Sequence, residues 1–118
     1  MAKALGIGGV FFRAEDPTAL AEWYKKHLEV TDFWMQQAGP TVFAPFKKSS
    51  DYFPAERQWM INFRVDDLPA LIDQLTAAGI AVETRPDEWD TAETGSFARI
   101  VDPEGNHIEL WQPPAMPD

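Results

Sequence analysis

Apolar residues recur at helical spacing in two stretches of the chain. The first stripe follows Asp16 and Pro17 and consists of Leu20, Trp23, Tyr24 and Leu28. The second follows Asp66 and Asp67, ends before Gly79, and consists of Leu68, Leu71, Ile72 and Leu75. Spacings of three and four residues put each stripe on one side of a helix. An Asp cap, a Pro in the first turn and a Gly stop are typical helix boundaries, so the pattern predicts two amphipathic helices.

Alternating apolar and polar residues predict strands before and after each helix. One strand covers 10–14, before the first helix, and another covers 61–65, before the second. Five further strand candidates follow the helices, two after the first and three after the second: 32–37, 41–46, 80–84, 96–101 and 106–112. The order of strand, helix and further strands therefore occurs twice.

The segment Asp102-Pro-Glu-Gly105 joins the last two strand candidates. Its Pro and Gly stand where a type I turn closed by a glycine bulge requires them. We therefore expect a hairpin in which Asp102 pairs with Asn106. This register creates two cross-strand neighbours on one face, Arg99 with Glu109 and Phe97 with Trp111.

An internal repeat supports the twofold order of elements. Residues 10–20 overlay residues 61–71, and five of the eleven positions are identical: Phe12 with Phe63, Arg13 with Arg64, Asp16 with Asp67, Ala19 with Ala70 and Leu20 with Leu71. A fixed internal offset indicates a structural duplication. We predict one domain over residues 1–118, with module one over about 4–46, a linker over 47–58 and module two over about 59–112.

A strand that lies under a helix buries one face against it and turns the other face away. The residues expected on the far face include arginines and aromatic rings, which are too costly to bury unpaired in a dry core. We therefore expect a concave, partly wet surface that binds a small molecule. Its candidate ligand-binding residues are Phe11, Arg13, Phe43, Met60, Asn62, Arg64, Phe97, Arg99, Glu109 and Trp111.

Composition and charge narrow the classes of partner and location. The chain has 10 basic and 19 acidic residues, a net charge of -9, which opposes binding to nucleic acid or an anionic membrane surface. It has no cysteine, which excludes disulfides and thiolate metal sites and favours a cytoplasmic location. No signal peptide or membrane-spanning run is apparent. Aromatic residues make up 13%, more than a plain core needs.

The paired modules, the Asp at each helix start and the ending Asp102-Pro-Glu-Gly-Asn-His-Ile-Glu-Leu-Trp111 resemble the vicinal oxygen chelate superfamily. That superfamily includes glyoxalase I, extradiol dioxygenases, epimerases, and bleomycin and fosfomycin resistance proteins. The resemblance implies an α+β fold in which two βαβββ modules form a cupped mixed sheet around a central cavity. It also implies a homodimer.

The resemblance further implies where metal-dependent members hold their ion, on the first and last strands of each module. These positions are Gly9, Phe43, Met60 and Glu109 in this chain. Only Glu109 offers a ligand for a hard divalent ion, and one carboxylate does not make a site. We expect no metal and no cofactor.

Several residues have more than one interpretation. Glu109 is either a structural partner of Arg99, a catalytic base or a remnant metal ligand, and His107 is the other candidate base. Arg13 and Arg64 form either a clamp for an anion or a solvated pair. The rings of Trp89, Tyr52 and Phe53 in long connections indicate a lid or a dimer contact.

Three classes of function follow. The first is a metal-free protein of the bleomycin-resistance type that binds a small, partly aromatic anion. The second is an enzyme of the same superfamily, a lyase, dioxygenase or epimerase, either metal-dependent or with Glu109 or His107 as base. Its metal-dependent form is disfavoured by the unsuitable ligand positions. The third is a dimeric regulatory module with a vestigial cavity, since fold alone does not decide function.

Overall fold

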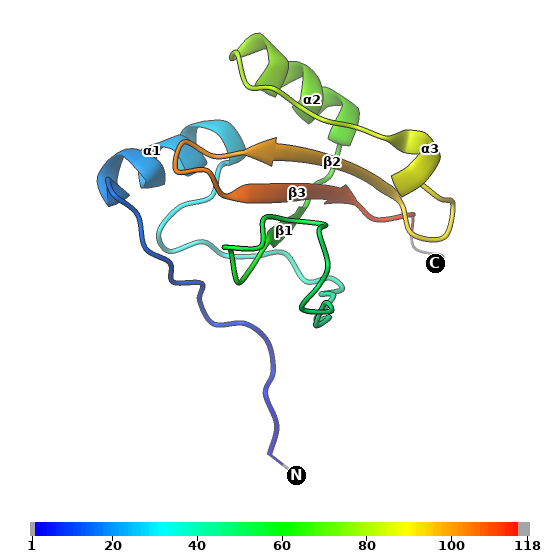
Figure 1. Ribbon diagram of the computed structural model, residues 1–118, viewed down its shortest axis with the longest axis horizontal. Helices are drawn as coiled ribbons and strands as arrows, with labels where there is room; N and C mark the ends of the chain where they lie inside the picture. The colour runs from blue at the N-terminus through cyan, green and yellow to red at the C-terminus, as the bar shows by residue number, and fades with distance from the viewer. Residues whose placement is uncertain (1, 116–118) are drawn as a thin grey trace.

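The computed structural model describes residues 2–115; residues 1 and 116–118, the two ends of the predicted domain, lie outside the described part. The elements are, in chain order, α1 (Pro17–Leu28), β1 (Ile61–Arg64), α2 (Leu68–Ala77), α3 (Pro86–Trp89), β2 (Ser96–Val101) and β3 (His107–Gln112) (Figure 1). The strands form one mixed sheet in the order β1-β3-β2, in which β3 is parallel to β1 and antiparallel to β2. The predicted α+β class is confirmed.

Both predicted helices form, and their boundaries follow the expected capping chemistry. Asp16 Oδ1 accepts a hydrogen bond from the backbone N–H of Ala19 at 3.0 Å, and Asp67 Oδ1 accepts one from Ala70 at 3.1 Å. Each carboxylate satisfies a backbone donor that the first turn leaves free. Helix α2 stops before Gly79, whose φ of +82° lies in the left-handed region.

The core lies between these two helices and one face of the sheet (Figure 1). Its buried apolar residues come from α1, α2, β2 and β3: Leu20, Tyr24, Leu68, Leu75, Ala98, Ile100, Ile108 and Leu110. Alternate residues of β2 and β3 therefore face the helices, as period-two alternation requires. Full burial of one such Leu or Ile side chain contributes about 1.5–3 kcal/mol.

The hairpin register agrees with the sequence expectation. The N–H of Asp102 donates to the carbonyl of Asn106 at 2.9 Å, and the N–H of Gly105 donates to the carbonyl of Asp102 at 3.0 Å. Gly105 has a φ of +84°, which the turn requires. The two pairs Arg99 with Glu109 and Phe97 with Trp111 are direct neighbours across β2 and β3.

The strands predicted for the first half do not form. In the described residues before β1 there is no strand, although 10–14, 32–37 and 41–46 have strand-like alternation. A strand persists only where its backbone groups pair with a neighbour, and these segments have none, which leaves Phe11 95% and Phe33 87% exposed. The predicted cup of two sheets around a central cavity is therefore not confirmed.

The candidate strand 80–84 is reduced to one bridge between Glu83 and Arg99. The N–H of Glu83 donates to the Arg99 carbonyl at 2.9 Å, and the N–H of Arg99 donates back at 2.8 Å. This bridge extends the sheet beyond β2 by a single pair. It places the start of α3 beside the strand that carries Arg99.

The turn at residues 102–106 ties the two halves of the chain together. Asp102 is buried; its Oδ2 accepts from the Tyr24 hydroxyl at 2.5 Å and from Asn106 Nδ2 at 2.9 Å. Glu104 accepts hydrogen bonds from the backbone just before α1, and Arg57 of the linker donates to Glu104 and Asn106. Burial, together with the Asp102 carboxylate, raises the pKa of Tyr24 far above 10.

In the described part of the chain, no helix is long and apolar enough to span a membrane.

Candidate functional site

The face of the sheet opposite the helices carries most of the predicted site residues. Paired positions across the strands place six of the ten candidates on this face: Asn62, Arg64, Phe97, Arg99, Glu109 and Trp111. Glu109 is the central member, since it pairs with Asn62 on one side and with Arg99 on the other. We call this surface the Glu109 face.

The other four candidates come from outside the three strands. Phe11 and Phe43 are 95% and 78% exposed, Arg13 is also exposed, and half-buried Met60 directly precedes β1. The expectation that Phe11, Arg13 and Phe43 lie on a shared sheet face is wrong for this structure. The reason is the missing pairing of the first half, because alternation orients side chains only within a paired strand.

The repeat-related arginines also fail to form a clamp. Arg64 Nη2 donates to the backbone carbonyl of Gln37 at 2.9 Å, and its guanidinium fills the space where Gly39 has no side chain. Arg13 is not on a strand beside β1, so the internal symmetry that would bring it near Arg64 is not realised. Arg64 anchors the loop around residue 37 to β1.

Glu109 is 9% exposed and both of its carboxylate oxygens accept hydrogen bonds. Asn62 Nδ2 donates to Oε1 at 2.8 Å, and the hydroxyl of Tyr52 donates to Oε2. Tyr52 belongs to the predicted linker and reaches the sheet across 57 positions of sequence. The linker therefore supplies one residue to the candidate site, and of the two interpretations, lid or dimer contact, this position of Tyr52 agrees with a lid.

Arg99 does not pair with Glu109, although the two residues are direct neighbours. Among the described residues, no ion pair within 4.0 Å involves Arg99. Its Cζ lies 4.6 Å from the ring centroid of Tyr52 and 5.4 Å from that of Trp89. Its Nε and Nη2 atoms are buried and have no hydrogen-bond partner in the described chain. The guanidinium thus lies over two aromatic rings while its Nε and Nη2 donors have no partner among the described residues.

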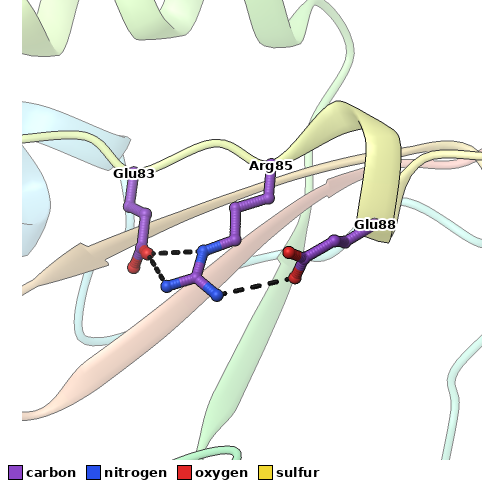
Figure 2. A network of polar contacts seen from close by, with 3 residues as sticks. All are labelled: Glu83, Arg85 and Glu88. Atoms are coloured by element: carbon purple, nitrogen blue, oxygen red, sulfur yellow. Dashed lines mark hydrogen bonds and ion pairs between the residues drawn. The ribbon is translucent and has the colours of Figure 1, made fainter.

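A small ionic network of Glu83, Arg85 and Glu88 lies at the start of α3, the helix that ends at Trp89 (Figure 2). Arg85 Nη2 lies 2.7 Å from Glu83 Oε2, and Arg85 Nη1 lies 3.5 Å from Glu88 Oε2. The Arg85 Cζ lies 5.6 Å from the Trp89 ring centroid, so Trp89 lies close to two arginines, Arg85 and Arg99. These ion pairs are exposed and individually weak, but they orient the short helix that carries Trp89.

The remaining aromatic residues extend this surface. Phe97 and Trp111 stack with 6.2 Å between ring centroids and an interplanar angle of 8°. Trp111 Nε1 donates to the Thr94 carbonyl at 2.7 Å. Two hollows lie on the described surface, one beside Trp23 and Asp102 and one between α2 and α3 that Phe97 also lines. On the Glu109 face, Tyr52 contacts Glu109 and Arg99.

Two titratable groups near Glu109 differ in their surroundings. Partial burial, with the hydrogen bond and charge of Glu109 next in effect, raises the pKa of Tyr52 to about 12, and hydrogen bonding by the Arg99 side chain and its charge oppose this rise. Tyr52 therefore stays protonated at neutral pH and donates to Glu109. His107, the other candidate base, is half-buried at the start of β3 opposite Val101, and its Nδ1 has no partner in the described residues.

Comparisons with known proteins agree with this fold. The glyoxalase-like domain family matches residues 9–111, which is most of the chain. The chain belongs to the glyoxalase-like family. Among solved structures, this glyoxalase-like domain is similar to the trypanothione-dependent glyoxalase I of Leishmania major, at 18% identity, a TM-score of 0.54, and coverage of 86% of this chain and 81% of that one. The resemblance to the vicinal oxygen chelate superfamily is confirmed.

A second similar structure is TnmS3, an antibiotic-binding protein from Streptomyces sp. CB03234. It shares 25% identity with a TM-score of 0.49, and the match covers 93% of the glyoxalase-like domain and 99% of that chain. A comparison with curated proteins gives no match.

The residues of this glyoxalase-like domain do not suit the metal site of metal-dependent relatives. Of the positions that the resemblance implies, Gly9, Phe43 and Met60 have no suitable ligand atom, and Glu109 is already hydrogen-bonded through both oxygens. Within residues 2–115, no three His, Asp or Glu side chains are grouped so that they could hold an ion. We derive no chemistry through a metal.

Proposed function

We propose that this glyoxalase-like domain binds a small, partly aromatic anion on the Glu109 face, without a bound metal ion. The observation that carries the proposal is the state of Arg99. Its positive charge is partly buried beside two aromatic rings and forms no ion pair with its neighbour Glu109 among the described residues. A charge in such surroundings requires a compensating partner.

The chemistry of the surrounding surface supports the same class of ligand. Small-molecule sites combine aromatic walls with a few well-placed polar groups. The Glu109 face has the stacked rings of Phe97 and Trp111, the rings of Tyr52 and Trp89, and only a few polar groups near Glu109. We propose binding and not catalysis, because both oxygens of Glu109 are already engaged as acceptors.

The test begins with the metal content and the ligand range of the purified protein. Elemental analysis should find no stoichiometric zinc, nickel, iron or manganese. A thermal-shift screen of small aromatic acids, phosphates and antibiotics should raise the Tm with aromatic anions. About one metal equivalent that is lost in Glu109→Gln would contradict the metal-free state. A screen in which no compound shifts the Tm would contradict the binding function.

We also propose that the protein is a homodimer located in the cytoplasm. Large apolar side chains remain exposed before β1, among them Leu5, Phe11, Phe33, Met35, Val42, Phe43 and Trp59. So many exposed apolar side chains support an interface with a second copy of the chain. Light scattering at micromolar concentration should give twice the mass of 13.3 kDa, and Phe11→Asp should shift the protein towards monomer. A monomer mass for the unmodified chain would overturn the dimer.

A further inference from the structure

The two uncommitted donors of Arg99 lie on one edge of its guanidinium. Nε and Nη2 carry N–H bonds that point the same way, and this edge matches two oxygens of a carboxylate or phosphate. Both atoms are buried, and neither has a partner in the described chain. Buried donors without partners are unfavourable in free energy, so the unpaired Nε and Nη2 groups of Arg99 favour the binding of an oxyanion.

Neither of the two carboxylates across from Arg99 fills that fork. The oxygens of Glu109 accept from Asn62 and Tyr52, and Glu83, which pairs with Arg99 on the other side, binds Arg85. The guanidinium meanwhile lies over the Tyr52 and Trp89 rings. The cation and the carboxylate therefore lie side by side with separate partners, and a ligand can engage both.

Tyr52 occupies this place in the way a phenolic ligand would. Its ring packs against the Arg99 guanidinium, and its hydroxyl donates to Glu109. It comes from the linker, which is not part of a helix or strand, so it can leave without disturbing the sheet. Tyr52 thus marks the position and polarity of the ligand group that would replace it.

We infer that the Nε and Nη2 edge of Arg99 binds the carboxylate of a phenolic acid, whose hydroxyl replaces that of Tyr52 on Glu109. This inference rests on the proposed binding function and names its ligand class. Cross-strand neighbours have Cβ atoms roughly 4.5–5.5 Å apart, so the two ligand groups must be held close together on one ring. A carboxylate suits the site better than a phosphate because its single charge adds less repulsion to Glu109.

The test uses 3-hydroxybenzoate as the probe. Calorimetry should give saturable binding, and the nitrogen-15 NMR signal of the Arg99 Nε–H group should shift during the titration. Benzoate lacks the donor and 3-hydroxybenzyl alcohol lacks the charge, so both should bind at least about tenfold more weakly. 3-Hydroxyphenyl phosphate should also bind more weakly. Tighter binding of the phosphate would overturn the choice of carboxylate.

Arg99→Lys keeps the charge but removes the planar fork, and it should weaken 3-hydroxybenzoate binding by about 10-fold to 150-fold. The matched change Arg57→Lys alters an arginine outside the Glu109 face, whose guanidinium donates to Asn106 and to the Glu104 carbonyl at the turn. Its effect should be within about threefold. A larger loss in Arg57→Lys than in Arg99→Lys, or an unmoved Arg99 signal during binding, would overturn the inference.

The failure of this inference is distinct from failure of the proposed function. If none of the four probes binds while the wider thermal-shift screen finds another ligand, the phenolic-acid inference is wrong and the binding function stands. If the wider screen is also negative, both are wrong.

Discussion

Tyr24 of α1 donates its hydroxyl hydrogen bond to Asp102 at 2.5 Å, across 78 positions of sequence. This contact joins the helix of the first half to the hairpin turn of the second. Asp102 also accepts from the backbone of Glu104 and Asn106 through Oδ1, so one buried carboxylate organises the turn and fixes α1 over the sheet. The Asp102 end of the family motif therefore serves architecture, and Glu109, where we propose that the ligand binds, lies further along β3.

Tyr24→Phe should destabilise the fold by about 1–3 kcal/mol, because it removes a buried hydrogen bond to a charged acceptor. Urea unfolding, with comparison of the midpoint at constant m-value, measures the loss. Tyr52→Phe is the matched control, since it removes a hydroxyl from a less buried position and should cost less. Equal stability of Tyr24→Phe and the unmodified protein would contradict the structural role of this contact.

Tyrosine ionisation should be delayed in the folded protein. The chain has two tyrosines, and the pKa of Tyr52 is raised to about 12 while that of Tyr24 is raised further. A raised pKa favours the protonated folded form, so this contribution to stability is complete below pH 10 and is lost as the pH rises towards about 12. Absorbance at alkaline pH should show little tyrosinate near pH 10 in the native protein. A native midpoint at the ordinary value of 10 would refute this prediction.

Tyr52→Phe should tighten the binding of 3-hydroxybenzoate. Without its hydroxyl, Tyr52 loses the hydrogen bond to Glu109, and the ligand displaces the ring at a lower free-energy cost. We expect a several-fold decrease in Kd, measured by calorimetry. Tyr24→Phe is the same chemical change at a remote position and should leave Kd unchanged. Weaker binding in Tyr52→Phe would mean that Tyr52 contacts the ligand and does not cover the site.

Gly95→Ala should destabilise the edge of the sheet strongly. Gly95 has a φ of +97°, and an added Cβ would lie 2.2 Å from the backbone oxygen of Gln112. Backbone strain at such a position costs about 1–3 kcal/mol, and the rigid carbonyl adds a steric penalty. Gly8→Ala is the control, because an added Cβ there meets nothing within 4 Å. Thermal unfolding of both variants tests the difference, and a similar Tm for the two would count against it.

Local chemistry made much of the second half predictable. The Asp caps, the Gly79 stop and the turn at Asp102 depend on residues within a few positions of each other, so their geometry follows from the sequence. The register that places Arg99 beside Glu109 follows from the turn in the same way. These short-range features determined the two helices, the hairpin and four residues of the Glu109 face, namely Phe97, Arg99, Glu109 and Trp111.

The conformation of the first half of the chain and the position of Tyr52 beside Glu109 depended on contacts between distant segments. Alternation in 10–14 predicts a strand, but the strand forms only if a neighbouring strand supplies its hydrogen bonds. The sequence of residues 10–14 does not identify that neighbouring strand. The hydrogen-bond donors to Glu109 could not be predicted from local sequence either, because Tyr52 comes from a linker and Asn62 from another strand. The sequence alone determined which residues could meet across a turn; only the tertiary structure decided that Arg99 stacks on aromatic rings and leaves Glu109 to Tyr52. The physical reason is that the Arg99 guanidinium and the Glu109 carboxylate each have several possible partners, and the packing of distant segments determines which partner each one contacts.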